Sequence, residues 1–156
     1  MTILQPYSYN YQGNKYTFIT DNSVVYSIEF TDGSFYFYDL PPDILVFELN
    51  IKVLNVVDSI VQPYDKRIEA TIVDILSNFF NNNKNSLIYV CNNLDSRQQA
   101  RYRKFDSWFN KNKVIQIEKY DVNVTIQDIQ ILASLILHAQ NPHKDLLVKL
   151  FYDLYR

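Results

Sequence analysis

The chain has little glycine, a single cysteine and no long apolar run, and each shortage excludes a class of protein. Two glycines in 156 residues leave no glycine-rich loop of the kind that cradles phosphates. One cysteine, Cys91, allows neither an intrachain disulfide nor a cysteine-based zinc site, and its apolar surroundings favour a buried, inert thiol. The longest apolar run, IQILASLILHA, is too short to span a bilayer, and the N-terminal residues lack the pattern of a signal peptide. We therefore expect a cytoplasmic protein without membrane contact.

The charge and the motifs exclude further classes. The formal net charge is −2 with acids and bases interspersed, which argues against a general nucleic-acid binder, although RQQARYRK places four basic residues around Tyr102. His138 and His143 have no third ligand at useful spacing, so we expect no metal site. No pattern typical of catalytic residues occurs, so we name none and lean against an enzyme.

The first third of the sequence is typical of strands joined by short turns. The segments KYTFIT, SVVYSIEF, FYFYDL and ILVFELNIKVL each have strand composition. Asp32 and Gly33 form the pair that a two-residue hairpin turn favours. These segments predict a four-stranded antiparallel meander.

The remaining sequence alternates between helical and strand patterns. Asp65 is a plausible N-cap for a helix that the NNNKN run stops, and SLIYVCNN is typical of a strand buried on both faces. A helix is expected at residues 96–111 and a strand at VIQIEKY. Residues 129–140 are ambiguous between helix and strand, and their alternation favours a strand. Asn141 and Pro142 predict the start of a last helix.

Together these elements predict an α+β fold in a single domain covering residues 1–156. The expected order is ββββ-α-β-α-ββ-α, with a largely antiparallel sheet of about six to seven strands and three helices. Neither a linker nor an internal repeat divides the chain.

This order over residues 16–140 resembles that of the acetyltransferase superfamily, which transfers acyl groups from acyl-coenzyme A to amines. The resemblance implies a pyrophosphate-binding, glycine-containing loop at the start of the helix after the fourth strand. Arg67 and Glu69 stand at the glycine positions of that loop, and Lys104 stands where a general-acid tyrosine is expected. The alternative function is therefore an N-acyltransferase with an altered phosphate loop, and coenzyme A is a cofactor only in that case.

A second resemblance covers most of the chain. YVCNNLDSRQQARYRKFDSWF, ATIVDILSNFF and LHAQNP are similar to a family of uncharacterised bacterial proteins associated with the Bacteroidota. That family has no assigned activity, so the resemblance implies no function.

The helix expected at residues 96–111 carries arginines on its apolar stripe. Arg101 shares one face with Tyr102, Phe105 and Trp108, and Arg97 lies at the edge of that face. A buried guanidinium must be paired, so Arg101 meets a carboxylate such as Asp65, Asp74 or Asp95, extends to water over Phe105, or receives an anionic ligand. In the last case Arg101 pairs with the anion, Arg97 supports it and Trp108 forms a wall of the site.

The tyrosines supply a second possible surface. Tyr36 and Tyr38 would share one face of the expected third strand, opposite Phe35 and Phe37. An uncovered face of this kind is typical of protein interfaces. We therefore expect a non-catalytic binding module whose partner is a protein or an anionic small molecule, and homo-oligomer formation is left open.

Overall fold

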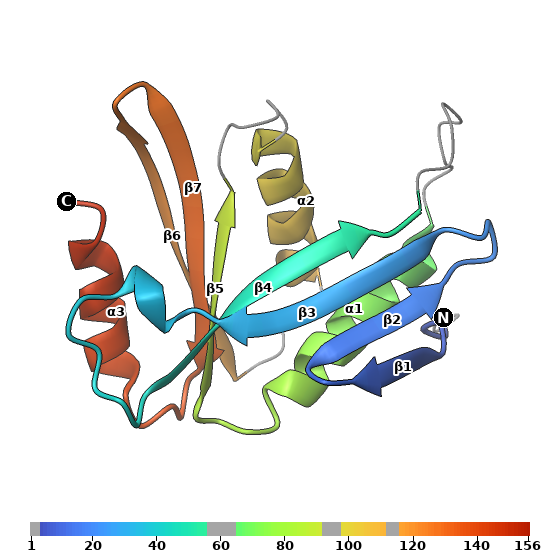
Figure 1. Cartoon of the computed structure of the whole chain (residues 1–156), viewed down its shortest axis with the longest axis horizontal. Coiled ribbons are helices and arrows are strands. Elements are labelled where there is room, and N and C mark those ends of the chain that lie inside the picture. Colours follow the sequence, from blue (N-terminus) through green and yellow to red (C-terminus); the bar gives the residue numbers. More distant parts are fainter. Residues whose placement is uncertain (1–3, 56–64, 92–97, 112–115) are drawn as a thin grey trace. The chain divides into compact units, whose positions relative to one another are not determined.

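The computed structural model describes residues 4–55, 65–91, 98–111 and 116–156, with the backbone alone for residues 98–101 (Figure 1). It confirms the α+β class, with seven strands and three helices in the predicted order. The elements are β1 (Tyr9–Gln12), β2 (Lys15–Ile19), β3 (Val25–Asp32), the short 3₁₀ helix η1 (Ser34–Tyr36), β4 (Leu45–Val53), α1 (Lys66–Phe79), β5 (Asn85–Cys91), α2 (Gln98–Lys111), β6 (Ile117–Ile126), β7 (Ile129–His138) and α3 (Lys144–Asp153).

The strands lie in the order β1-β2-β3-β4-β5-β7-β6, and most neighbours are antiparallel. The exception is β4 with β5, which are parallel and pair over residues 45–48 and 85–88. A parallel pair needs a long crossover connection, and α1 supplies it.

The chain divides into two compact units. Unit 1 contains residues 1–31 and 49–79, and unit 2 contains residues 32–48 and 80–156. Strand β4 contributes residues to both units, so this division does not test the prediction of one domain, which stays a prediction.

In unit 1, helix α1 lies along one face of strands β2 and β3 (Figure 1). Ile72 and Ile75 of α1 are fully buried, as expected for an apolar stripe at helical spacing. At the C-terminal end of α1, the rings of Phe79 and Phe30 stack with centroids 4.2 Å apart. Asp65 caps α1 as predicted, because its Oδ1 accepts a 2.9 Å hydrogen bond from the Arg67 amide.

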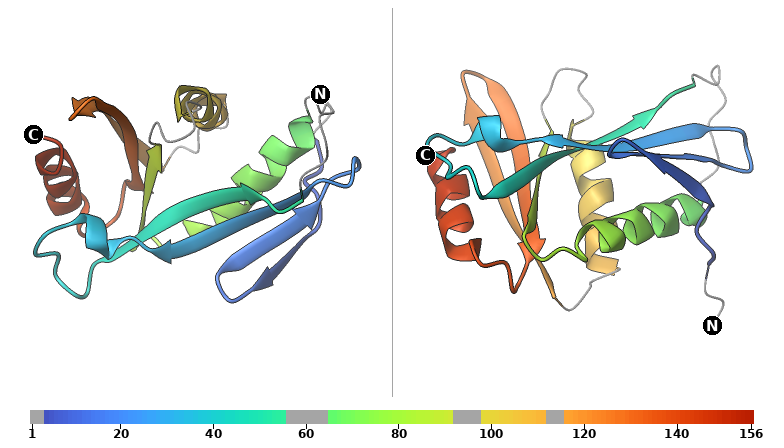
Figure 2. Two further views of the ribbon diagram at one scale, coloured as in Figure 1. Left: turned by 45° about the horizontal axis from the view of Figure 1, so that its top comes forward. Right: turned by 60° about the horizontal axis from the view of Figure 1, so that its bottom comes forward.

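In unit 2, α2 and α3 cover opposite faces of strands β5 to β7 (Figure 2). Side chains alternate along the strands, so each face receives every second residue. The α3 face includes the buried residues Phe37, Ile44, Val46, Ile88, Val122, Ala133, Leu135, Leu137, Leu147 and Phe151. Residues 132–137 of β7 are all buried, because a central strand is covered on both sides. The strand interpretation of residues 129–140 is therefore confirmed.

Two predictions for the first third are wrong. The segment FYFYDL forms no strand, since it begins in η1 and continues as a loop, and the fourth strand of the set is β1. Asp32 and Gly33 form no hairpin turn, because Gly33 has φ −109° and its amide donates to the Val46 carbonyl at 2.9 Å. Gly33 is needed for close approach: a Cβ there would lie 3.0 Å from the Glu48 nitrogen and 3.1 Å from Ile88 Cγ2.

The two-residue hairpin turns occur elsewhere. Gly13 and Asn14 have φ values of 57° and 62° between β1 and β2. Gln127 and Asp128 have φ values of 50° and 66° between β6 and β7. Both turns have the positive φ at both central residues that the type I′ hairpin requires.

The last helix also differs slightly from its prediction. Helix α3 begins at Lys144, two residues after Pro142. Asn141 instead closes a turn, in which its Oδ1 accepts a 2.8 Å hydrogen bond from the His143 amide. The predicted start of α2 at Ser96 lies outside the described residues.

Candidate functional site

Helix α2 carries most of the predicted site, and its C-terminal half is apolar where it meets the sheet. Phe105 is 3% exposed, and its ring lies 4.6 Å from that of Tyr89 on β5. Trp108, the predicted wall of an anion site, is 9% exposed. The apolar part of the predicted stripe is therefore core.

Tyr102 and Asp106 of α2 meet polar side chains of β6 and β7 in a group that we call the α2 cluster: Tyr102, Asp106, Lys119, Asp121 and Ser134. The Lys119 ammonium lies 2.6 Å from Asp106 and 2.5 Å from Asp121, and 5.1 Å from the centroid of the Tyr102 ring. Ser134 is fully buried and donates a 2.7 Å hydrogen bond to Asp121. Tyr102 also hydrogen-bonds Asp121.

The electrostatics of the α2 cluster fix its protonation. Burial works to raise the pKa of Asp121, but hydrogen bonds from Lys119, Ser134 and Tyr102 outweigh it and lower that pKa. Burial and the bond to Asp121 raise the pKa of Tyr102. Two carboxylates then surround one ammonium, so these described groups carry a net charge of about −1 near neutral pH. A net negative cluster repels an anion bound close to Tyr102.

The structure does not describe the side chain of either arginine of the predicted anion site. Arg97 lies outside the described residues. Arg101 belongs to the α2 backbone, but its side chain is outside the described part. The anion site at Arg97, Arg101 and Trp108 therefore stays a prediction.

The predicted tyrosine surface is a loop rather than a strand face. We define the aromatic loop as residues 32–43, which run from the last residue of β3 through η1 toward β4. Tyr36 is half-buried, and its hydroxyl donates a 2.7 Å hydrogen bond to Glu48 on β4. Phe35 and Tyr38 are 68% and 86% exposed, and the Phe35 ring stacks on Tyr36 with centroids 4.3 Å apart. Tyr36 and the buried Phe37 thus anchor the loop, while Phe35 and Tyr38 face solvent.

The base of the aromatic loop is held by short hydrogen bonds. Asp32 accepts bonds from the amide and the hydroxyl of Ser34 at 2.9 and 3.0 Å, and these bonds lower the pKa of Asp32. The Gly33 amide is bound to β4 as described above. The exposed rings therefore project from a base with defined geometry.

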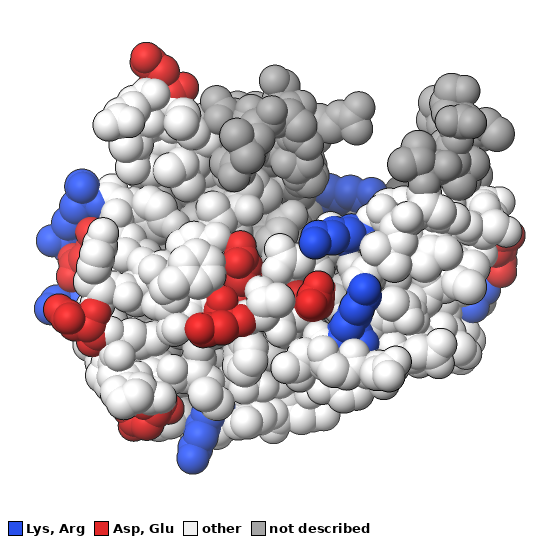
Figure 3. Space-filling view, viewed as in Figure 1, with Lys and Arg blue, Asp and Glu red and all other residues white. Residues whose placement is uncertain are grey.

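The aromatic loop is also acidic. Residues 16–51 contain no Lys or Arg but six acids, which are Asp21, Glu29, Asp32, Asp39, Asp43 and Glu48. The His143 Nε2 lies 4.0 Å from Asp43. The face shown in Figure 3 carries both acidic and basic side chains near its middle.

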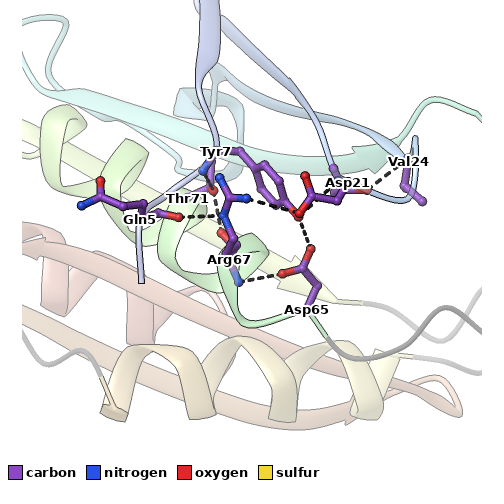
Figure 4. Close-up of polar contacts among 8 residues, drawn as sticks. Gln5, Tyr7, Asp21, Val24, Asp65, Arg67 and Thr71 are labelled. Carbon is purple, nitrogen blue, oxygen red and sulfur yellow. Dashed lines mark hydrogen bonds and ion pairs between the residues drawn. The ribbon is translucent and has the colours of Figure 1, made fainter. Parts of the chain in front are cut away.

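A further polar cluster occupies the start of α1, where the acyltransferase resemblance implies a phosphate site (Figure 4). The Arg67 guanidinium stacks 3.9 Å from the centroid of the Tyr7 ring and donates to the Gln5 carbonyl at 2.9 Å. It also pairs with Asp21 at 3.3 Å. The Tyr7 hydroxyl donates to the second oxygen of Asp65. The helix end that would face an anion is thus occupied by a carboxylate and by the N-terminal segment.

Metal ligands and membrane helices give no additional site. No group of three or more His, Cys, Asp or Glu side chains in the described ranges is arranged to hold a metal ion. His138 instead bonds Gln116 at 3.1 Å, and Cys91 is buried as predicted. None of the helices that the structure describes combines the length and apolar content needed to cross a membrane.

Comparison with known families gives one match. A family of unknown function (DUF6169) matches residues 64–153. The chain belongs to this family. No curated protein and no solved structure matches the chain.

The matched region contains one of the two candidate surfaces and not the other. The DUF6169 region runs from just before α1 to the end of α3, so it contains the whole α2 cluster. The aromatic loop lies outside it. Sequence reasoning missed the α2 cluster, although Tyr102 was placed on the correct face. Two features of the sequence could have indicated this cluster. Ser134 interrupts the apolar run LASLIL, and Lys119 and Asp121 lie in the strand segment EKYD, so both segments place polar groups in the sheet.

Proposed function

We propose that the chain is a non-catalytic module that binds a basic segment of a protein partner through the aromatic loop. The observation that carries the proposal is the exposure of Phe35 and Tyr38, 68% and 86%, beside an anchored Tyr36. Aromatic rings are enriched at protein interfaces, because they bury a large area while few torsions must be fixed.

The charges identify the chemistry of the partner. Asp32, Asp39 and Asp43 lie in the aromatic loop, in a stretch without Lys or Arg. An exposed ring attracts a Lys or Arg side chain through its quadrupole, and nearby carboxylates add Coulomb attraction. A segment with several Lys or Arg residues therefore fits this loop better than an acidic or a purely apolar one.

The α2 cluster supports a non-catalytic role. The lowered pKa of Asp121 keeps this carboxylate ionised and committed to three donors. The raised pKa of Tyr102 keeps its hydroxyl protonated, so it is a poor general base. A serine that donates to a carboxylate, without a histidine among the described neighbours, is not an activated nucleophile.

The test is a calorimetric titration with a synthetic peptide of alternating Arg and Gly, against a control peptide of alternating Glu and Gly. We expect the basic peptide alone to bind. The double variant Phe35→Ser and Tyr38→Ser should weaken binding about tenfold, since two exposed cation–π contacts are worth about 1–2 kcal/mol together. The matched control is Tyr11→Ser, which removes a 59% exposed ring from unit 1 and should leave binding unchanged.

A second variant separates charge from aromaticity. Asp39→Asn with Asp43→Asn keeps the shape of the loop and should weaken binding and its dependence on salt. The proposal fails if both peptides bind equally, if neither binds, or if the loop variants bind as well as the wild type.

A second candidate is the acyl-coenzyme A dependent N-acyltransferase. It is favoured by one observation, the order of elements, in which α1 links the parallel pair β4 and β5. Asp65 and Glu69 at the start of α1 oppose it, because a carboxylate there repels a pyrophosphate. Coenzyme A at a hundred times its dissociation constant would raise the free energy of unfolding by about 2.7 kcal/mol. Such a thermal shift would support the enzyme, and its absence would remove the candidate.

The same thermal-shift assay tests the anion site. Inorganic phosphate should stabilise the wild type but not Arg101→Ala if Arg97 and Arg101 receive an anion. Equal shifts in both proteins would place the bound anion elsewhere.

A further inference from the structure

Strand β6 is an open edge of the sheet among the described residues. It stands at the end of the strand order, and β7 is its one neighbour. Its ten residues pair in a continuous register, from Ile117 opposite His138 to Ile126 opposite Ile129, with neither a bulge nor a proline. The other end of the sheet is β1, which has four residues. Long, regular edges are templates for the addition of another strand, whereas short ones are not.

The register shows which backbone groups of β6 face outward. In an antiparallel pair, residues alternate between those bonded to the neighbouring strand and those directed away from it. The Ala139 amide donates to the Gln116 carbonyl at 2.7 Å, so Gln116 belongs to a bonded pair. The residues that flank a two-residue hairpin turn form a hydrogen-bonded pair, and here these are Ile126 and Ile129. Counting back from Ile126 by twos reaches Gln116, so the two observations agree. The backbone groups directed away from β7 are therefore those of Ile117, Lys119, Asp121, Asn123 and Thr125.

Lys119, the one lysine of β6, does not project from the edge into solvent. An exposed lysine on an edge strand prevents pairing, because pairing would bury its charge. The Lys119 side chain is 5% exposed and lies between Asp106 and Asp121 inside its own chain. The edge can therefore receive a strand without burying an unpaired lysine.

We propose that β6 pairs antiparallel with β6 of a second copy of this chain, in a two-fold symmetric register centred on Val122. In this register Asp121 lies opposite Asn123 of the other copy, and Lys119 lies opposite Thr125. Tyr120 lies opposite Val124, an aromatic and β-branched pair of the kind that stabilises sheets. Two-fold symmetry makes each pair twice, and every residue from 118 to 126 has a partner.

Charge disfavours the neighbouring register centred on Asp121. A register centred on Asp121 places two carboxylates directly opposite each other, which is destabilising. The register centred on Val122 opposes no like charges, since Glu118 faces Ile126. The surface therefore fits a second copy of itself.

The first test is sedimentation velocity of the full chain from about 10 µM to about 1 mM, the range in which a weak strand pairing is visible. We expect a reversible dimer in the wild type. Asn123→Pro removes one outward amide without breaking a bond to β7, and should abolish the dimer. The matched control Asn123→Thr loses the same side-chain bond to Gln130 but keeps the amide, and should dimerise like the wild type. A monomeric wild type, or a dimer that survives Asn123→Pro, overturns the proposal.

The second test uses the wild type alone, so it does not depend on whether the proline variant folds. Amide hydrogen exchange by NMR should slow at the higher concentration for Lys119, Asp121, Asn123 and Thr125, whose amides face the edge. The amides of Tyr120, Val122 and Val124 already bond to β7 and should change little. Uniform change, or no change at the outward amides, contradicts strand pairing. The double variant Phe35→Ser and Tyr38→Ser should leave dimer formation intact, which separates this surface from the aromatic loop.

Discussion

The hydroxyl of Tyr36 donates a 2.7 Å hydrogen bond to Oε1 of Glu48, and this bond ties the aromatic loop to β4. The neighbouring ring of Phe35 is stacked on Tyr36 and exposed. Burial and the bond to Glu48 raise the pKa of Tyr36, so the hydroxyl stays a donor throughout the neutral range. A fixed ring beside exposed ones reduces the entropy that the loop must lose when a partner binds.

Tyr36→Phe should therefore loosen the aromatic loop while keeping its apolar surface. The variant loses one hydrogen bond to a charged group in a half-buried setting, so we expect the free energy of unfolding to fall by about 1–2 kcal/mol. Urea denaturation measures this change. Tyr38→Phe removes the same atom from a side chain that is 86% exposed and should change stability by less than about 0.5 kcal/mol. Equal effects from the two variants would contradict the anchoring role of Tyr36.

Lys119 balances two carboxylates, so its removal should cost more than the loss of one ion pair. In Lys119→Met the carboxylates of Asp106 and Asp121 remain without their shared cation. Their side chains are 37% and 43% exposed, so water screens part of the repulsion. We expect a loss of about 1–2 kcal/mol in the free energy of unfolding, between the value of an exposed ion pair and the cost of breaking a fully buried one.

A double variant checks the cause of that loss. Asp106→Asn in the Lys119→Met background removes one of the two negative charges and should restore part of the lost stability, measured by the same urea unfolding. In the wild-type background Asp106→Asn should instead destabilise. If the two substitutions were simply additive, repulsion between the carboxylates would not explain the effect of Lys119→Met.

The order of elements could be predicted from the sequence because periodicity records burial. The helical spacing of Ile72 and Ile75 reflects which side of α1 is buried, and the apolar composition of residues 132–137 reflects the burial of β7 on both faces. Turns were harder to predict. Asp32-Gly33 has hairpin composition, but its glycine serves a close backbone approach, whereas Gln127-Asp128 forms the real turn without glycine. Tertiary contacts decide such cases, and a local pattern does not contain them.

The candidate site was predictable in part for the same reason. A helical wheel placed Tyr102, Phe105 and Trp108 on one face of α2 correctly. The wheel could not show that Asp121 and Ser134 lie beneath Tyr102, because these residues come from β6 and β7 and are distant from α2 in the sequence. The exposure of Tyr38 also depended on a loop that composition favoured as a strand.

The bond between Tyr120 and Glu118 should make stability depend on pH at both ends of the range. Hydrogen bonds from Tyr120 and then from Lys144 lower the pKa of Glu118 from its usual 4.5. Stability from a lowered carboxyl pKa is present above the unfolded value and is lost as the pH falls through the folded one. The bond to Glu118 and burial raise the pKa of Tyr120 from 10.0 to about 12. Stability from a raised phenol pKa is present below 10 and is lost as the pH rises through 12.

The difference in stability between the wild type and Tyr120→Phe should therefore form a plateau near neutral pH. We expect it to shrink below pH 4.5 and again above pH 10. Urea denaturation of both proteins over this pH range measures the difference. A difference that stays constant from neutral pH into the acid range would show that Glu118 does not sense the Tyr120 hydroxyl.

Asp65 serves helix α1 and the N-terminal segment together, and a pair of substitutions can separate the two roles. One carboxylate oxygen accepts from the Arg67 amide at 2.9 Å, and the other accepts from the Tyr7 hydroxyl. Asp65→Ala removes both acceptors, so we expect the free energy of unfolding to fall by about 2 kcal/mol, from a lost cap and a lost hydrogen bond. Asp65→Asn keeps an oxygen for the cap, because Asn is as good an N-cap as Asp, and should lose about half as much.

Hydrogen exchange of the Arg67 and Tyr7 amides reports the two roles separately. Asp65→Asn should leave the Arg67 amide protected, and Asp65→Ala should expose both. The Tyr7 amide donates a 2.8 Å hydrogen bond to Thr71 Oγ1, so full protection of this amide in Asp65→Ala would show that the segment stays docked on α1 without the carboxylate.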